Sequence, residues 1–263
     1  MQKLIQIAAA TVLIFGATVG VSSAAEVGFR SVDFPTTGGI QGRADIYESK
    51  NSSATLILLF HQAGWSRGEY REIAPQLVER GYRVMAVDQR SGGSVNGVRN
   101  ETHHRAAKMG LGTSYLDAYS DLESALSYAH EVLKAERVIV WGSSYSASLV
   151  FRLAAEHAQD VSAVLAFSPG EYFKKEKGTE YIRGLAARVD QPLFVTSAKT
   201  EREQAKPVFD ASPATKKILF TPASGGQHGS RALWKRWPDH DVYWVAVGAF
   251  LEEYAPPTNP KPN

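Results

Sequence analysis

The sequence predicts a three-layer α/β fold, with a mostly parallel central sheet and helices on both of its faces. Strand-like and helical runs alternate along the chain, as they do in βαβ units. Two strand-like runs, residues 54–60 and 82–87, are apolar on both faces, as expected of strands buried in a parallel sheet. A length of 263 residues, 44% of them hydrophobic, is enough for one such domain with a sizeable core.

The individual elements follow from periodicity and from turn residues. Strands are assigned where short apolar or alternating runs are bounded by turn residues, and helices where apolar side chains recur every three or four positions. Gly81 follows the first helical run and is a typical helix-ending residue. In chain order, strands are expected at residues 29–34, 40–47, 54–60, 82–87, 138–141, 161–167, 192–197 and 217–221, and helices at residues 69–80, 115–133, 147–157, 201–209 and 233–254.

Three segments fit neither period. Residues 91–112 are long and polar, which predicts a surface loop near the strand ends. Residues 171–188 are mixed and charged, and are interpreted as a small cap. Residues 255–263 are rich in Pro and Asn, which predicts a disordered tail.

The first 25 residues are typical of a secretory signal peptide. Lys3 gives the segment a positive start, residues 4–21 are almost wholly apolar or small, and residues 22–25 (SSAA) allow cleavage after Ala25. The alternative is an uncleaved anchor, although the run is short for a spanning helix. We therefore expect a signal peptide at 1–25, a folded domain at 26–254, and a periplasmic or secreted protein that does not associate with a membrane once the segment is cleaved.

Charge and cysteine content exclude several classes of protein. The formal net charge is only +2, so the chain has no electrostatic basis for binding nucleic acid or an anionic membrane surface. The absence of cysteine excludes disulfides and thiolate metal sites.

The segment VIVWGSSYSASL, residues 138–149, predicts a strand, a sharp turn and a helix that together present a serine at the edge of the sheet. In such a strained turn, the residues two before and two after the nucleophile come close together and must be small. Ser144 is flanked in this way by Gly142 and Ser146, whereas Ser143 would be flanked by Trp141 and Tyr145. Ser144 is therefore the predicted nucleophile.

A serine nucleophile needs a base, and the base needs a carboxylate to fix its tautomer. His228 lies in a glycine-rich loop after the last expected strand and is the predicted base, with His240, beside Asp241, in reserve. Two glutamates follow strands and are candidates for the acid. Glu201 is favoured over Glu171 because an acid at the strand end just before the histidine suits the order of such triads.

The developing oxyanion needs backbone N–H donors that are in place before the reaction. The amide of Tyr145, directly after the nucleophile, is one expected donor. The other is expected from the turn after strand 54–60, at Ala63 or, one residue earlier, at Gln62.

Five segments resemble α/β-hydrolase-fold serine hydrolases in their order and approximate spacing: HQAGWSRGEY, VDQRSGG, GSSYS, PLFVTSAKTE and QHGSRAL. The similarity covers nearly the whole chain after residue 25 and is closest to the dienelactone-hydrolase-like and small esterase branches. It implies Ser144, His228 and Glu201 as a triad, with Ala63 and Tyr145 in the oxyanion hole. The chain departs from the family pattern in three ways, with Gln62 in place of Gly, Glu201 in place of Asp, and no cysteine nucleophile. Asp88 and Arg90 match a family position that joins loops.

These observations predict a serine hydrolase that cleaves carboxylic esters through a Ser-His-Glu triad and an acyl-enzyme intermediate. The expected partner is a small-molecule ester, and no cofactor or metal is expected. A peptidase or amidase of the same fold, and a catalytically silent binding protein on this scaffold, are the alternatives.

Overall fold

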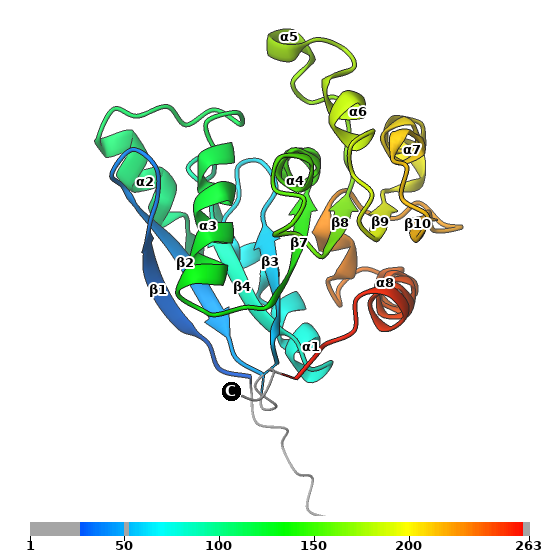
Figure 1. The fold of residues 1–263 in the computed structure, drawn as a ribbon, viewed down its shortest axis with the longest axis horizontal. Helices are drawn as coiled ribbons and strands as arrows, with labels where there is room; N and C mark the ends of the chain where they lie inside the picture. Colours follow the sequence, from blue (N-terminus) through cyan, green and yellow to red (C-terminus); the bar gives the residue numbers. More distant parts are fainter. Residues whose placement is uncertain (1–26, 50–52, 260–263) are drawn as a thin grey trace, which may run out of the picture.

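A computed structural model describes residues 27–49 and 53–259 (Figure 1). The predicted signal peptide lies outside these residues. The main strands are β1 (Arg30–Pro35), β2 (Gln41–Tyr47), β3 (Thr55–Phe60), β4 (Arg83–Asp88), β7 (Arg137–Ser143), β8 (Ala163–Phe167), β9 (Leu193–Thr196) and β10 (Lys217–Phe220). The α-helices are α1 (Ile73–Glu79), α2 (Glu101–Lys108), α3 (Tyr119–Glu131), α4 (Tyr145–Glu156), α5 (Lys174–Lys177), α6 (Tyr181–Ala186), α7 (Arg202–Ala211) and α8 (His240–Tyr254).

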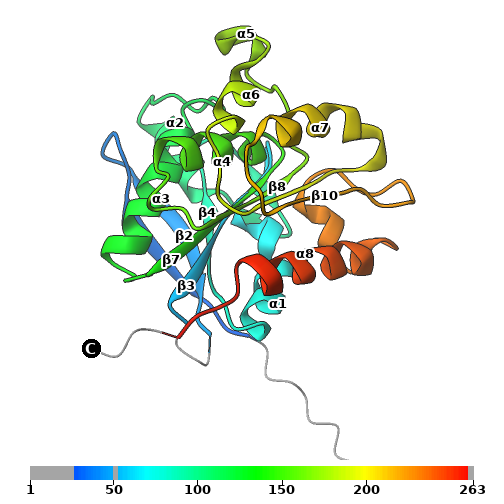
Figure 2. The same ribbon diagram turned by 45° about the vertical axis from the view of Figure 1, so that its right-hand side comes forward.

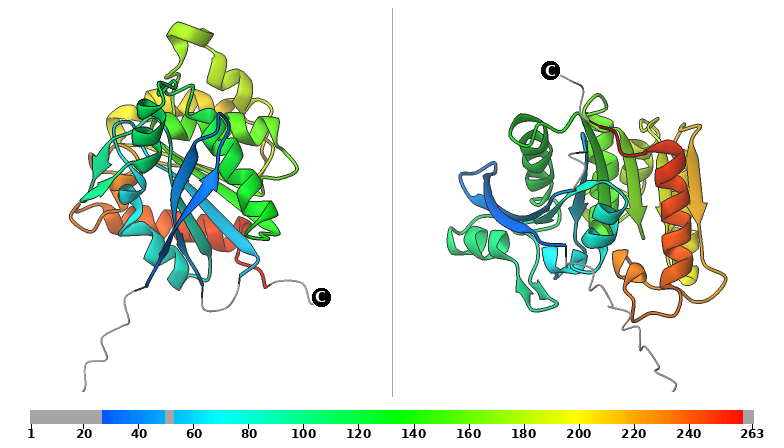
Figure 3. Two further views of the ribbon diagram at one scale, coloured as in Figure 1. Left: turned by 90° about the vertical axis from the view of Figure 1, so that its left-hand side faces the viewer. Right: turned by 90° about the horizontal axis from the view of Figure 1, so that it is seen from below.

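The eight main strands form one sheet in the order β1-β2-β4-β3-β7-β8-β9-β10. β1 and β2 are antiparallel to their neighbours, and the other six strands are parallel to one another. The left view of Figure 3 looks onto the β1–β2 edge. The register places Phe60 of β3 opposite both Val87 of β4 and Gly142 of β7. The carboxyl ends of these strands therefore meet at a single edge of the sheet, which is where ligands bind in parallel α/β sheets.

Helices cover both faces of the sheet, which confirms the predicted three-layer α/β architecture. Leu56 and Leu58 of β3 pack into a core that includes α3 and α4, whereas Ile57 and Leu59 pack into a second core that includes α1 and α8. This division follows from the alternation of side chains along a strand. In Figure 2 the sheet passes between the α3–α4 pair and the α1–α8 pair.

Two buried arginines, Arg67 and Arg90, form ion pairs that join loops at the carboxyl edge of the sheet. Arg67 lies in the 3₁₀ turn η1 (Arg67–Tyr70) and forms an ion pair with Asp88 at the end of β4 at 2.6 Å. It forms a second ion pair with Asp45 of β2. Arg90 contacts Asp121 of α3 at 2.7 Å. Because breaking a buried pair leaves an uncompensated charge, these contacts fix the relative positions of the loops. Asp88 and Arg90 therefore have the joining role that the family resemblance implies.

Two expected segments differ in the structure. Residues 91–112 are not wholly irregular, because they contain α2 and a short ribbon of β5 (Ser94–Val95) and β6 (Val98–Arg99). Asn100 is the N-cap residue of α2, and its side chain accepts a hydrogen bond from the His103 amide. This cap allows a helix to start within the polar segment. The last helix begins at residue 240 and not 233, because η3 (Ser230–Leu233) and a further turn precede it. The segment 171–188, interpreted as a small cap, contains α5 and α6, which lie at the top of Figure 1.

Part of the predicted disordered tail is hydrogen-bonded to the sheet. The Ala54 amide donates to the carbonyl oxygen of Thr258 at 2.7 Å, and the Thr258 amide donates to Thr55 Oγ1 at 3.2 Å. Proline and asparagine predict a lack of regular structure, but they do not exclude an irregular segment that supplies acceptors to the start of a strand. Residues 260–263 lie outside the described part of the chain. Within the described ranges, no helix is both long and apolar enough to cross a membrane.

Removal of residues 256–263 is expected to lower the free energy of unfolding by about 1–3 kcal/mol, because the buried Ala54 amide loses its acceptor. Removal of residues 260–263 alone leaves the Thr258 hydrogen bonds intact and serves as the control. Urea denaturation followed by circular dichroism measures both variants. Equal unfolding midpoints for the two truncations would contradict this role for Thr258.

Candidate active site

The turn between β7 and α4 holds Ser144 in a strained backbone conformation. Its φ of 60° and ψ of −123° lie outside the regions that a side-chain-bearing residue adopts easily. Gly142 makes the turn possible, since a Cβ atom added there would lie 2.2 Å from the carbonyl oxygen of Ser146. The close approach of these two flanking residues is the feature expected when Ser144, and not Ser143, occupies the centre of the turn.

Ser146 occupies the flanking position where glycine is usual, and its hydroxyl is hydrogen-bonded. It donates to the carbonyl oxygen of His61 at 2.7 Å and accepts from Gln89 Nε2 at 2.5 Å. His61 follows β3 and Gln89 follows β4, so Ser146 links the exits of two strands to the start of α4. Ser146 and both of its partners are buried, and these hydrogen bonds offset the cost of burying the Ser146 hydroxyl.

Ser144, His228 and Glu201 form a continuous chain of hydrogen bonds. Nε2 of His228 lies 2.8 Å from Ser144 Oγ, and Nδ1 of His228 lies 2.7 Å from Glu201 Oε1. With a proton on Nδ1, the imidazole donates to the carboxylate and accepts the serine hydroxyl proton at Nε2. The three residues come from the turn after β7, from η2 (Lys199–Glu201) after β9, and from the loop after β10.

The second oxygen of Glu201 is also held. It accepts hydrogen bonds from Ser168 Oγ at 2.7 Å and from the Ala198 amide at 3.3 Å. Burial raises the pKa of Glu201, but the hydrogen bonds from His228 and Ser168 outweigh it and keep this pKa below its ordinary value. The carboxylate is therefore ionised when the imidazole needs a negative partner.

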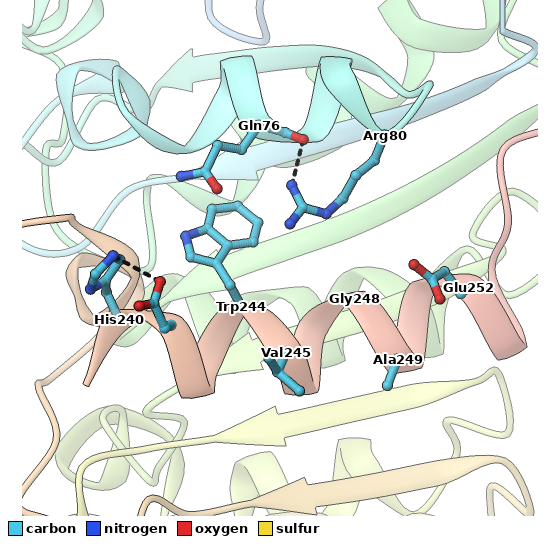
Figure 4. A pocket seen from close by; sticks show the side chains of 9 residues that line it. Gln76, Arg80, His240, Trp244, Val245, Gly248, Ala249 and Glu252 are labelled. Atoms are coloured by element: carbon cyan, nitrogen blue, oxygen red, sulfur yellow. Dashed lines mark hydrogen bonds and ion pairs between the residues drawn. The ribbon is translucent and has the colours of Figure 1, made fainter. Parts of the chain in front are cut away.

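Neither alternative candidate lies in this chain of hydrogen bonds. Glu171 accepts hydrogen bonds at 2.9 Å from the amides of Ile182 and Arg183 at the start of α6. His240 lies at the end of a groove between α1 and α8, with Nε2 3.0 Å from Asp241 Oδ1 (Figure 4). The groove has a volume of about 610 Å³, and neither Ser144 nor His228 lines it.

The amides of Ala63 and Tyr145, which are expected to bind an oxyanion, differ from the alternative amide of Gln62 in their hydrogen bonding. The Gln62 amide is already used, because it donates to Glu69 Oε2 at 2.8 Å. Among the described residues, the amides of Ala63 and Tyr145 have no acceptor. Tyr145 is the first residue of α4, where N–H groups lack partners within the helix and favour negative charge.

A cavity of about 380 Å³ lies beside Tyr172, which is also a neighbour of Ser144. It is lined by residues 114–116 from one side and by Tyr172, Phe173 and Glu176 from the other. The hydroxyl of Tyr172 lies 3.4 Å from Ser144 Oγ and donates to the carbonyl oxygen of Ser168 at 2.9 Å. The Tyr115 ring stacks on the Tyr145 ring with centroids 4.4 Å apart. The segment interpreted as a cap thus supplies an aromatic wall next to the nucleophile.

Sequence reasoning does not anticipate two residues near the site. Glu69 is predicted to lie in an ordinary helix, yet its carboxylate is fully buried and bonded to the loop after β3. Ser168 reads only as a strand-ending residue, yet it contacts Glu201 and accepts from the Gly229 amide at 2.9 Å. Their partners are more than 30 residues away, or lie across a turn, so periodicity carries no signal for either contact.

Comparison with known families identifies a match over much of the chain. Residues 51–232, more than half of the chain, match the family model described as "Serine aminopeptidase, S33". No curated protein matches the chain by sequence.

Solved structures of hydrolases share the fold. The esterase Pf2001 of Pyrococcus furiosus has 18% sequence identity and a TM-score of 0.64, over 87% of this chain and 93% of that one. A dienelactone hydrolase of Anabaena variabilis has 13% identity and a TM-score of 0.67, over 87% and 99%. Est1E of Butyrivibrio proteoclasticus, solved with ferulic acid bound, has 13% identity and a TM-score of 0.64, over 85% and 98%.

The family match and the sheet topology agree with the resemblance drawn from the sequence. The chain belongs to the serine aminopeptidase S33 family of α/β-hydrolase-fold enzymes.

Proposed function

We propose that the protein is a serine hydrolase that cleaves carboxylic esters, with Ser144 as nucleophile, His228 as base and Glu201 as acid. The observation that carries the proposal is the hydrogen-bonded chain from Glu201 through His228 to Ser144, with distances of 2.7 and 2.8 Å. Such a chain converts a weakly nucleophilic hydroxyl into one that can attack a carbonyl carbon.

The chemistry follows from the geometry in two steps. Ser144 Oγ attacks the ester carbonyl while its proton passes to His228 Nε2, and the oxyanion accepts hydrogen bonds from the Ala63 and Tyr145 amides. His228 then protonates the leaving alkoxide, which departs as the alcohol and leaves an acyl group on Ser144. In the second step a water molecule gives a proton to His228 and attacks the acyl carbonyl, and Ser144 regains its proton as the carboxylic acid leaves.

The cavity beside Tyr172 supports an acyl group with a flat aromatic part. Its walls include Tyr115, Tyr172 and Phe173, whose ring faces favour offset or edge contacts with another ring. The ferulic acid bound to Est1E is such a group on a related fold. We therefore include aryl-substituted acyl esters among the substrates of the proposed reaction.

A peptidase is the second candidate, because the family model carries the description of an aminopeptidase. An aminopeptidase must hold a protonated amino terminus, and the only carboxylate that lines the described cavity beside Tyr172 is Glu176, an exposed residue among lysines at 174, 175 and 177. This environment favours an ester over a peptide amino terminus. Comparing chromogenic acyl esters with aminoacyl anilides decides between the two activities, and faster turnover of the anilides would favour the peptidase.

We also propose that the protein acts after export, in the periplasm or outside the cell. The support is the sequence pattern of residues 1–25, which is typical of a cleaved signal peptide.

The change Ser144→Ala is expected to lower kcat on a short-chain ester by about 10⁴-fold or more, because it removes the nucleophile. Initial rates of ester hydrolysis measure the change. The change Ser224→Ala, at an exposed serine in the loop that carries His228, is the control and should leave kcat unaltered. Retained turnover in the Ser144 variant would show that the chain acts through another residue, and absence of turnover in the unaltered protein on all esters would favour a binding protein.

The change Glu201→Gln is expected to lower kcat by about 10²–10⁴-fold, because a neutral amide neither fixes the Nδ1–H tautomer nor stabilises the imidazolium. The change Glu171→Gln is the matched control, since it makes the same substitution at the start of α6, away from His228. Its kcat should stay close to that of the unaltered protein. The reverse ranking of the two variants would assign the acid to Glu171.

A further inference from the structure

A second carboxylate, Glu69, lies at the junction of the loops that carry the candidate site. It belongs to η1, and its side chain has no exposed surface. The ester-cleaving steps proposed above do not use it. A fully buried glutamate is uncommon unless it is paired or hydrogen-bonded.

Glu69 accepts one hydrogen bond with each of its carboxylate oxygens. Oε2 accepts from the Gln62 amide at 2.8 Å, and Oε1 accepts from Ser143 Oγ at 2.7 Å. Ser143 Oγ in turn accepts from the Ser230 amide at 2.9 Å. The carboxylate therefore connects three segments that are distant in sequence: the loop with the expected oxyanion amide, the residue before Ser144, and the residue two after His228.

Further contacts restrain the backbone of η1 and the loop that carries His228. Trp234 Nε1 donates to the carbonyl oxygen of Glu69 at 2.8 Å, which fixes the backbone of η1. Gly229 packs against the same network, since a Cβ atom added there would lie 2.5 Å from Ser143 Oγ. A shift of the Glu69 carboxylate would thus be transmitted to the loops on both sides of Ser144.

We propose that Glu69 is a positioning residue for ester hydrolysis, whose ionised carboxylate holds Gln62, Ser143 and Ser230 in the arrangement that aligns the oxyanion amide, the nucleophile and the base. The inference rests on the proposed function of Ser144 and His228. Because Glu69 holds the Gln62 amide, it also restrains the following residue, Ala63, whose amide is the expected oxyanion donor.

The charge of Glu69 acts on the reaction as well as on the geometry. Burial raises the pKa of Glu69 to about 7, against the hydrogen bonds from Ser143 and Gln62 and the charges of His228 and Arg231, which lower it. The groups facing it are His228 from the loop after β10, Arg231 from η3 and Tyr70 from its own turn. Because ionised Glu69 and protonated His228 attract each other, Glu69 favours the imidazolium that forms as Ser144 attacks.

The pH profile of kcat/KM separates this role from a purely structural one. In the unaltered protein Glu69 must be ionised, so this carboxyl should contribute to a fall in kcat/KM as the pH decreases through about 7. In Glu69→Gln, which keeps the side-chain volume, this contribution should be absent and the acid side of the profile should be less steep. We expect kcat to drop about 10–100-fold in this variant, with KM changed less than about threefold.

The free energy of unfolding provides an independent readout, because ionisation of Glu69 should lower stability while it supports activity. The pKa of Glu69 in the folded protein, about 7, lies above the ordinary value of 4.5, so ionisation opposes folding and stability falls as pH rises through this range. Glu69→Gln should lack that fall and be at least as stable as the unaltered protein at pH 8 in urea denaturation. A less active but equally stable variant is the pattern expected of a positioning charge, and a merely structural acid would lose stability together with activity.

The control is Glu72→Gln, the same change at an exposed residue three positions along the chain, which should alter neither readout. Ser143→Ala, a second variant, removes one of the two hydrogen bonds and should lower kcat less than Glu69→Gln. A Glu69→Gln protein with unaltered kcat and an unaltered acid slope would overturn the inference. Labelling of Ser144 by an organophosphonate in the unaltered protein reports on the proposed function separately, because it needs the nucleophile and does not depend on the role of Glu69.

Discussion

The close approach of the backbone at Gly142 and Ser146 is the constraint on which the site depends. A non-glycine residue with a φ of 60° and a ψ of −123° costs about 1–3 kcal/mol relative to a relaxed conformation. Such a turn persists only where surrounding contacts compensate for its strain. Here the Ser144 amide donates to the carbonyl oxygen of Phe167 on β8 at 2.8 Å, and the Ser146 hydroxyl is bonded on both sides. The sheet and the following helix therefore hold the hydroxyl of Ser144 at the edge where the other loops meet.

Buried polar contacts around this turn explain why the loops are held in one arrangement. His61 is fully buried, and burial lowers its pKa to about 4, so its ring stays neutral and accepts from the Gln89 amide at 3.1 Å. Glu201 and Glu69 each use both carboxylate oxygens. Hydrogen-bonded groups of this kind cost stability when a single partner is lost, which makes alternative loop positions unfavourable.

Much of the fold and the core of the site could be predicted from the sequence, because they depend on local patterns. Apolar runs such as residues 54–60 identify buried strands, and small residues on either side of Ser144 identify the turn. The choice between Glu201 and Glu171 was not local. Both follow strands, and only the fold shows that Glu171 binds the start of α6 while Glu201 reaches His228.

Two of the missed features share a physical cause, because each depends on a partner that is distant in sequence. Thr258 is fixed by Ala54, and Glu69 is buried by Ser143 and Gln62, so neither role follows from composition or period. The helix at residues 101–108 was missed for a different reason, since a polar helix with a good cap resembles a loop when only apolar periodicity is considered.

The most direct measurement is the position of a covalent organophosphonate adduct. The tryptic peptide that spans residues 138–152 contains three serines of the turn and the helix start, Ser143, Ser144 and Ser146, as well as Ser148. Fragmentation of the labelled peptide by mass spectrometry assigns the adduct to one of them. We expect modification of Ser144 alone. An adduct on Ser143 or on any other residue, or a protein that forms no adduct, would contradict it.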